Sequence, residues 1–153
     1  MHLRKRLRST SFRTFVLYPL MVIAWEWLVN EGRVNLRPAY VPLLVWGYLQ
    51  YRLIGKYRIR HGGGGPGMDT PPERLVTTGP FAWSRNPMYL GHIVFLLGLT
   101  LTLQSRLAAA ITIATAVWFQ FRVRRDEKRL RERFGAPYRE YCARVARWIP
   151  RLI

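Results

Sequence analysis

The chain has 153 residues, enough for one domain and hardly for two, and half of them are hydrophobic. It carries 25 Lys and Arg against 8 Asp and Glu, a formal net charge of +17. A basic soluble domain suggests a nucleic-acid partner, but here the charges and the apolar residues occupy separate segments, so we expect no nucleic acid. The single cysteine, Cys142, excludes an internal disulfide, and the three scattered histidines have no metal-ligand spacing, so no metal is expected.

Four apolar segments follow a basic leader at residues 1–13, each close to the ~20 residues that cross a bilayer. They are residues 14–29, 39–54, 87–104 and 107–121. The pattern predicts an all-α integral membrane protein of one domain, with about four transmembrane helices. No G-x-G-x-x-G follows a strand, so no Rossmann domain is expected. Two alternatives are a signal peptide, which lacks a cleavage site here, and a soluble four-helix bundle, which residues 93–103 oppose because they have no polar face.

The basic residues alternate along the chain in a way that predicts topology. They are dense in the leader, in the loop at 55–86 and in the helical tail at 122–153, and sparse in the other two connections. The positive-inside rule then places both termini in the cytoplasm, with a bacterial inner membrane as the expected location.

Two features have no clear functional assignment. Glu26 lies in the first span between Trp25 and Trp27, where it is either a functional ionisable group or a hydrated interfacial residue paired with Arg33. Residues 62–67 (GGGGPG) are predicted to be a flexible loop. They lack the lysine and the preceding strand of a phosphate-binding loop, which disfavours phosphate binding there.

The stretch Gly79–His92 (GPFAWSRNPMYLGH) is the most informative part of the sequence. Asn86 suits an N-cap and Pro87 a first helical residue, so the third span should begin there. Tyr89 and His92 are then three residues apart and share a face of the helix.

A second polar stretch, residues 124–130 (RRDEKRL), follows the fourth span. No breaker precedes Gly135, so this helix should continue into the cytoplasm. If the third and fourth spans form a hairpin centred near Ser105, equal rise per residue brings Tyr89 to about the level of Val123. Asp126 and Glu127 then lie one turn further out, at the mouth of the hairpin.

A third stretch, residues 134–150, begins with Gly135 as a helix end and Pro137 as a new helix start. A continuous helix would place Tyr138, Tyr141, Val145 and Trp148 on one stripe. Such a helix could lie on the membrane surface or cover the hairpin mouth as a lid, and both roles are compatible.

The order of GPF…SRNPMYLG, an apolar hairpin, DEKRL and FGAPYREYCARVARWIP resembles the isoprenylcysteine carboxyl methyltransferase and phospholipid methyltransferase superfamily. Its pattern is R-H-P-x-Y-x-G, then E-E-x-x-L, then F-G-x-x-Y-x-x-Y. The resemblance covers residues 74–150 and implies an integral-membrane methyltransferase that uses S-adenosyl-methionine. Two positions depart from the pattern: Asn86 stands where the family has histidine, and Asp126 where it has the first glutamate. Asparagine does not titrate, which argues against proton transfer there.

The resemblance implies a set of cofactor-binding residues, which are Arg85, Asn86, Pro87, Tyr89, Gly91, His92, Asp126, Glu127, Tyr138 and Tyr141. Arginine suits the carboxylate of the methyl donor, a carboxylate such as Glu127 suits its ammonium or ribose, and tyrosine rings suit adenine and sulfonium. Arg85, Glu127 and His92 are the candidate catalytic residues, the last two as bases for an amine or thiol. A structural hydrogen bond is the alternative for His92.

The expected acceptor is apolar or lipid-like and arrives from the surrounding membrane lipids. Isoprenylcysteine carboxylate, a phosphatidylethanolamine amine and a small thiol all fit the resemblance. A non-catalytic membrane adaptor or lipid-binding protein is the alternative from another class. It is disfavoured because an adaptor would not need Arg85, Tyr89 and Glu127 around one cavity.

Overall fold

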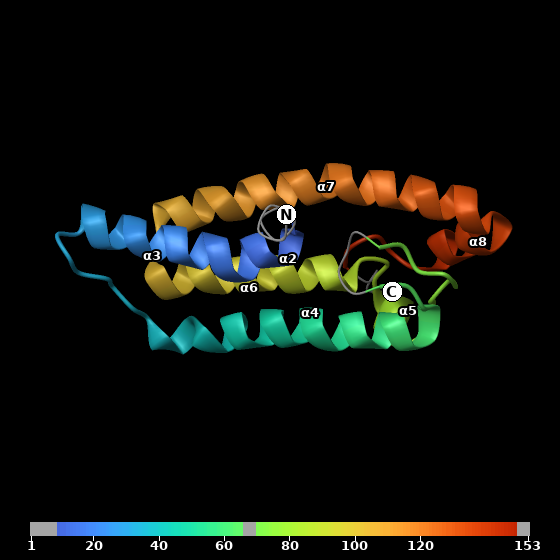
Figure 1. The fold of residues 1–153 in the computed structure, drawn as a ribbon, viewed down its shortest axis with the longest axis horizontal. Helices are drawn as coiled ribbons and strands as arrows, with labels where there is room; N and C mark the ends of the chain where they lie inside the picture. The colour runs from blue at the N-terminus through green and yellow to red at the C-terminus, as the bar shows by residue number, and fades with distance from the viewer. Residues whose placement is uncertain (1–8, 66–69, 150–153) are drawn as a thin grey trace. The chain divides into compact units, whose positions relative to one another are not determined.

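A computed structural model describes residues 9–65 and 70–149 of the chain. In these ranges all regular secondary structure is helical, as the sequence predicts (Figure 1). Most of the basic leader, including Arg4, Lys5, Arg6 and Arg8, lies outside the described residues, as do the last part of the 62–67 loop and Pro150.

The helices follow one another along the chain, and the longest connection, residues 63–79, lies between α4 and α5. They are α2 (Thr10–Phe12), the π-helical segment Arg13–Leu17, α3 (Tyr18–Val29), a 3₁₀ turn (Pro38–Tyr40), α4 (Val41–Gly62), α5 (Pro80–Trp83), α6 (Pro87–Leu103), α7 (Arg106–Phe134) and α8 (Ala136–Arg144). The described residues form two compact units, and α4, α6 and α7 each contribute to both. Of the described residues, the first unit comprises 9–49 and 91–117, and the second 50–65, 70–90 and 118–149.

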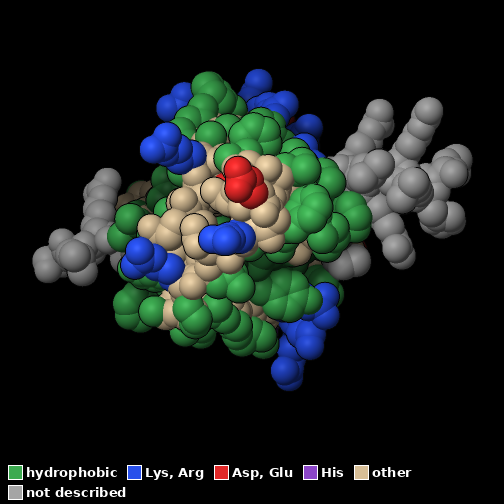
Figure 2. Space-filling view, turned by 90° about the vertical axis from the view of Figure 1, so that its left-hand side faces the viewer, with side chains coloured by type: hydrophobic (Ala, Val, Ile, Leu, Met, Phe, Trp, Pro, Cys, Tyr) green, Lys and Arg blue, Asp and Glu red, His purple; other side chains and the backbone are tan. Residues whose placement is uncertain are grey.

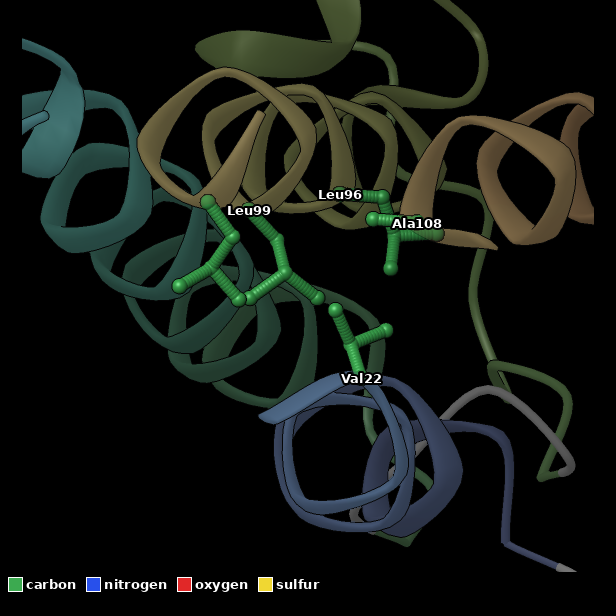
Figure 3. Close-up of a cluster of buried hydrophobic side chains, with 5 residues drawn as sticks. Val22, Leu96, Leu99 and Ala108 are labelled. Carbon is green, nitrogen blue, oxygen red and sulfur yellow. The ribbon is translucent and has the colours of Figure 1, made fainter. Parts of the chain in front are cut away.

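The first unit is built around a small apolar core. Val22 of α3, Leu96 and Leu99 of α6 and Ala108 of α7 point toward one another (Figure 3), and all are at most 4% exposed. Deleting contacts of this kind costs both transfer free energy and a cavity. The core therefore holds α3, α6 and α7 together.

Glycine permits the close approach of α4 and α6 in this unit. A Cβ atom at Gly47 would collide with the backbone nitrogen of Phe95 and lie 2.7 Å from the carbonyl oxygen of Gly91. A Cβ atom at Gly98 would lie 2.8 Å from the backbone nitrogen of Leu44. The two helix backbones thus touch at positions where only glycine fits, as is common where helices pack in membranes.

The predicted hairpin is confirmed in the first unit. Leu103 ends α6 and Arg106 begins α7, and the Oγ of Ser105 accepts a hydrogen bond from the backbone N–H of Ala108 as an N-cap. Across the hairpin, the hydroxyl of Thr112 donates to the carbonyl of Leu96 at 3.2 Å. The two helices are therefore joined both at the turn and along their length.

Residues Thr10–Val29 form one helix that is long and apolar enough to cross a membrane by length and composition. It is the single helix in the described ranges that passes both tests, and α6 is apolar but shorter. Much of the apolar surface of α3 is exposed, with Leu20 at 61% and Leu28 at 68%. Hydrophobic side chains also cover much of the face shown in Figure 2, where few acidic side chains are seen. Glu26 in this helix accepts a hydrogen bond from the side chain of Asn30 at 2.9 Å, rather than pairing with Arg33 as considered from the sequence.

Three helix boundaries can be compared with the predictions, and two of them differ. Residues up to Gly62, expected in the 55–86 loop, continue α4, because no breaker interrupts the sequence before the glycine run. The continuation of α7 to Phe134 is confirmed. The predicted stripe after Pro137 is wrong beyond Arg144, because Val145 is extended (φ −113°, ψ 130°) and ends α8.

Candidate functional site

The site lies in the second unit, and its first wall is the turn that precedes α6. Gly79 has φ +57°, and a Cβ there would lie 2.6 Å from the ring of Tyr57, so glycine is required. After the short helix α5, Ser84 accepts a hydrogen bond from the backbone N–H of Asn86 at 3.2 Å, and Pro87 begins α6. The side chain of Asn86 does not cap α6 but donates to the carbonyl of Arg147 at 3.1 Å.

A cavity of about 240 Å³ opens in this unit, slightly below the ~300–1,000 Å³ usual for small-molecule sites. Its walls come from α4, the loop at residues 70–76, the turn before α6 with the first residues of α6, α7 and α8. The lining residues are Arg58, Thr70, Pro71, Pro72, Leu75, Val76, Phe81, Arg85, Asn86, Pro87, Met88, Tyr89, Asp126, Arg129, Leu130, Arg133, Tyr138 and Tyr141. All three sequence blocks contribute to it.

Tyr89 and Asp126 join α6 to α7 at this cavity. The phenolic O–H of Tyr89 donates to Oδ2 of Asp126 at 2.6 Å and accepts from Nε of Arg122 at 2.9 Å. Edge-on contact with Phe119, at a centroid distance of 4.7 Å, fixes the ring. The hairpin register predicted from the sequence is therefore confirmed, and it places a carboxylate with a charge-assisted hydrogen bond in the wall.

Two buried tyrosines of α8 form the opposite wall. Tyr138 and Tyr141 are 2% and 3% exposed, and the hydroxyl of Tyr141 donates to the carbonyl of Phe81 at 2.6 Å. Burial raises the pKa of both phenols above the ordinary value, and the nearby charge of Glu127 raises it further, so both rings stay neutral.

Arginines give the cavity a positive wall. Four line it, Arg58, Arg85, Arg129 and Arg133, against the single carboxylate of Asp126. Arg58 is 8% exposed and donates to the carbonyls of Gly65 and Thr70 at 2.9 and 2.8 Å, so it fastens the Thr70 end of the wall to α4. Burial lowers the pKa of Arg58 from its ordinary value.

Glu127 lies beside the cavity without lining it. Its side chain is 6% exposed and accepts a forked pair of hydrogen bonds from Arg147, with Nη2–Oε2 at 2.8 Å and Nε–Oε1 at 3.2 Å. Nη2 of Arg85 also approaches Oε1, at 3.5 Å. The hydrogen bonds to Glu127 raise the pKa of Arg147 above its ordinary value.

The structure brings together most, but not all, of the predicted site residues. Those that line the cavity are Arg85, Asn86, Pro87, Tyr89, Asp126, Tyr138 and Tyr141. Gly91, His92 and Glu127 are not among the lining residues. His92 belongs to the first unit, where it is fully buried and packs against Phe15 at a centroid distance of 4.7 Å.

Sequence reasoning missed three residues that the structure brings to the site. Arg58 follows the second apolar segment, where several other basic residues occur, so its position in the sequence did not mark it as a site residue. Arg122 lies one helical turn before Asp126, so its i, i+4 spacing was an available signal. Arg147 carried no signal, because its partners Glu127 and Asn86 lie 20 and 61 residues away along the chain.

The fold and the cavity define an all-helical protein with a basic, tyrosine-lined cavity built on a helical hairpin. Residues 63–136 match the model of the phospholipid methyltransferase family. The chain therefore contains a phospholipid methyltransferase family domain over just under half of its length, and it is similar to isoprenylcysteine methyltransferases.

Two of three curated relatives of the chain are named as methyltransferases. Over 78 residues the chain is 42% identical to a protein-S-isoprenylcysteine O-methyltransferase of Saccharomyces cerevisiae, which covers 50% of this chain and 32% of that protein. Over 78 residues it is 35% identical to the protein of that name from Homo sapiens, covering 50% and 27%. Over 79 residues it is 33% identical to the nickel-cobalt-cadmium resistance protein NccN of Alcaligenes xylosoxydans xylosoxydans, covering 51% and 37%. The chain thus spans about a third of the length of these relatives.

Proposed function

We propose that the chain is an integral-membrane methyltransferase that takes its methyl group from S-adenosyl-methionine and acts on an apolar or lipid-like acceptor. One observation carries the proposal. Residues from all three blocks of the methyltransferase pattern, including Arg85, Tyr89, Asp126 and Tyr138, line one cavity. The match to the phospholipid methyltransferase family model supports the same activity.

The residues of the cavity fit this methyl donor chemically. Nε of Arg85 is buried and has no hydrogen-bond partner among the described residues, so it has an N–H available for the donor's carboxylate. Asp126 supplies a carboxylate for the ammonium or the ribose hydroxyls. The faces of Phe81, Tyr138 and Tyr141 suit the adenine and the sulfonium.

The part played by the protein is binding, alignment and exclusion of water. The methyl donor, when bound, supplies an activated methyl group on a sulfonium. Arg85 and Asp126 would fix the two ends of its amino-acid portion, and the buried tyrosines would keep water from the transfer path. A carboxylate acceptor needs no general base. An amine acceptor needs a base, and Asp126, the one carboxylate among the described lining residues, serves either as that base or as the partner of the donor's amino-acid portion, not as both.

We propose that the apolar segments 14–29, 39–54, 87–104 and 107–121 span the membrane, with both termini in the cytoplasm of a bacterial cell. The length and apolarity of Thr10–Val29 support the first span. Exposed apolar side chains on the other segments, such as Trp46 at 58% and Ile113 at 66%, support contact with lipid. A reporter fused to the C-terminus should be cytoplasmic, and an external reporter would contradict this topology.

The names of the relatives suggest two acceptors. The curated relatives from yeast and human are named for isoprenylcysteine, which offers a carboxylate oxygen, and the family model is named for phospholipids, which offer an amine. The positive wall formed by Arg58, Arg129 and Arg133 favours an acceptor with an anionic group, and both molecules carry one.

Binding of the methyl donor is the direct test. Calorimetry on detergent-purified protein should detect S-adenosyl-methionine, and Arg85→Ala should weaken binding by roughly tenfold or more, since it removes a hydrogen bond to a charged group. Arg106→Ala, at an exposed position in the hairpin turn, is the matched control and should bind normally. Well-folded wild-type protein that does not bind the donor would refute the proposal.

Radiolabelled methyl transfer into membrane extracts then separates the acceptors. Label in lipid indicates phospholipid methylation, whereas a volatile base-labile product indicates a methyl ester.

A further inference from the structure

The segment that follows α8 folds back onto the turn before α6. The backbone N–H of Arg85 donates to the carbonyl of Ala146 at 3.0 Å. The carbonyl of Arg147 accepts hydrogen bonds from the side chains of Asn86 at 3.1 Å and Ser84 at 3.4 Å. These bonds join residues about 60 positions apart in the sequence. The extended backbone of Val145 ends α8 at Arg144 and directs the chain toward this turn.

The side chain of Arg147 anchors the same segment to α7. Its Nε atom donates to Oε1 of Glu127 at 3.2 Å and its Nη2 atom to Oε2 at 2.8 Å, the pair of parallel bonds that guanidinium favours. One residue further on, the indole N–H of Trp148 donates to Oε1 of Gln120 at 2.8 Å. Residues 145–149 are thus held on two sides, by the turn before α6 and by α7.

Glu127 connects this anchor to the cavity. Nη2 of Arg85 lies 3.5 Å from Oε1 of Glu127, the oxygen that also accepts the hydrogen bond from Nε of Arg147. Arg85 lines the cavity, whereas Glu127 and Arg147 do not. Both oxygens of Glu127 are therefore engaged by arginines, and the side chain is not among the residues that line the cavity.

A buried carboxylate between two guanidinium groups depends strongly on each of its partners. Removing one partner of a buried pair leaves an uncompensated charge, which is usually strongly destabilising locally. Without Arg147, Glu127 would lose its forked partner and be free to draw the guanidinium of Arg85 toward itself. Without Glu127, the two arginines would repel each other. In both cases Arg85 would leave its present place in the cavity wall.

We infer that Arg147 and Glu127 are positioning residues that hold Arg85 in the cavity wall, where it meets the carboxylate of the methyl donor. This inference rests on the proposed function, because it takes the donor's carboxylate as the ligand of Arg85. It also assigns Glu127, a residue of the family's acidic pair, to positioning instead of to direct cofactor contact.

The test compares two ligands on detergent-purified full-length protein. S-adenosylhomocysteine has the amino-acid portion with its carboxylate, and methylthioadenosine lacks it. Calorimetry on Arg147→Ala should show about tenfold weaker binding of S-adenosylhomocysteine, corresponding to loss of a charge-assisted bond. Binding of methylthioadenosine should change by less than about twofold, the range of neutral surface substitutions. A general structural role would weaken both ligands equally.

Three further variants complete the design. Glu127→Gln keeps the shape and removes the charge, so it should reproduce the selective loss. Arg147→Lys keeps the charge without the fork and should recover part of the affinity. Arg139→Ala, on the exposed side of α8, is the matched control and should bind both ligands as wild type does.

The outcomes separate this inference from the proposed function. Wild-type protein that binds neither ligand contradicts the proposed function and the inference with it. Wild-type protein that binds S-adenosylhomocysteine, with Arg147→Ala and Glu127→Gln unchanged or equally weakened toward both ligands, overturns the inference alone. If Arg147→Ala does not fold, as judged by size-exclusion chromatography and circular dichroism, Glu127→Gln and Arg147→Lys decide the result by the same comparison.

Discussion

Replacing Tyr89 by phenylalanine removes one oxygen atom from the cavity wall and keeps the ring. In the native protein this oxygen donates to Asp126 at 2.6 Å and accepts from Arg122 at 2.9 Å. The ring packs edge-on against Phe119 at 4.7 Å and would remain there. Tyr89→Phe therefore separates the contribution of hydrogen bonding from that of packing.

The expected loss follows from the charges and the exposure of the partners. A hydrogen bond to a charged group contributes about 1.5–3 kcal/mol to stability. The side chain of Asp126 is 28% exposed, so water can replace part of the lost bond, and Arg122 stays 3.8 Å from the carboxylate as a partial substitute. The lower end of the range applies, about 1.5 kcal/mol, which is roughly a tenfold change in the unfolding equilibrium.

Reversible unfolding in mixed micelles, with increasing amounts of a denaturing detergent, measures this change. Tyr40→Phe, at a tyrosine that is 36% exposed, serves as the matched control and should leave the midpoint unchanged. A Tyr89→Phe variant as stable as wild type would refute the argument that the hydrogen bond between α6 and α7 stabilises the hairpin. A loss as large as that of Tyr89→Ala would show instead that the ring had moved and that packing was the cause.

Two further predictions concern helix contact and pH. Gly47→Ala should destabilise the protein by about 1–3 kcal/mol, because its Cβ would meet the backbone of α6. Gly55→Ala in the same helix should cost less, since its Cβ would lie 3.4 Å from the mobile end of a methionine, and equal midpoints in thermal melts would contradict the difference. Stability should fall as the pH rises above about 10, because Tyr138 and Tyr141 keep their protons in the folded protein while the unfolded chain releases them. Absorbance at the phenolate band should show these two rings ionising only with unfolding, and early ionisation of all the tyrosines would contradict their burial.

Those parts of the fold that depend on local chemistry were predictable from the sequence. Pro87 begins α6, Ser105 caps α7 at the hairpin turn, and Gly135 separates α7 from α8, each as its residue type suggested. The hairpin register followed from the helical rise alone and correctly brought Tyr89 near Asp126. Four membrane spans and cytoplasmic termini remain predictions.

Long-range hydrogen bonds decided what the sequence could not. The predicted helical stripe does not continue to Trp148, because α8 ends at Arg144. The carbonyls of Ala146 and Arg147 instead accept hydrogen bonds from the turn before α6. His92 shares a predicted helix face with Tyr89, yet it packs against Phe15 in the first unit. Nothing in the local sequence of either segment identifies these partners.

The sequence by itself determined that the apolar and basic residues lie in separate segments. It also determined that three blocks carry residue types that suit a methyl donor. It could not determine which of two adjacent acids faces the cavity. Neighbouring residues on a helix point about 100° apart, so packing selects one of them. Tertiary structure places Asp126 in the wall beside Tyr89 and turns Glu127 toward Arg147 and Arg85. The reason is physical, since a buried carboxylate must lie where cations can compensate its charge.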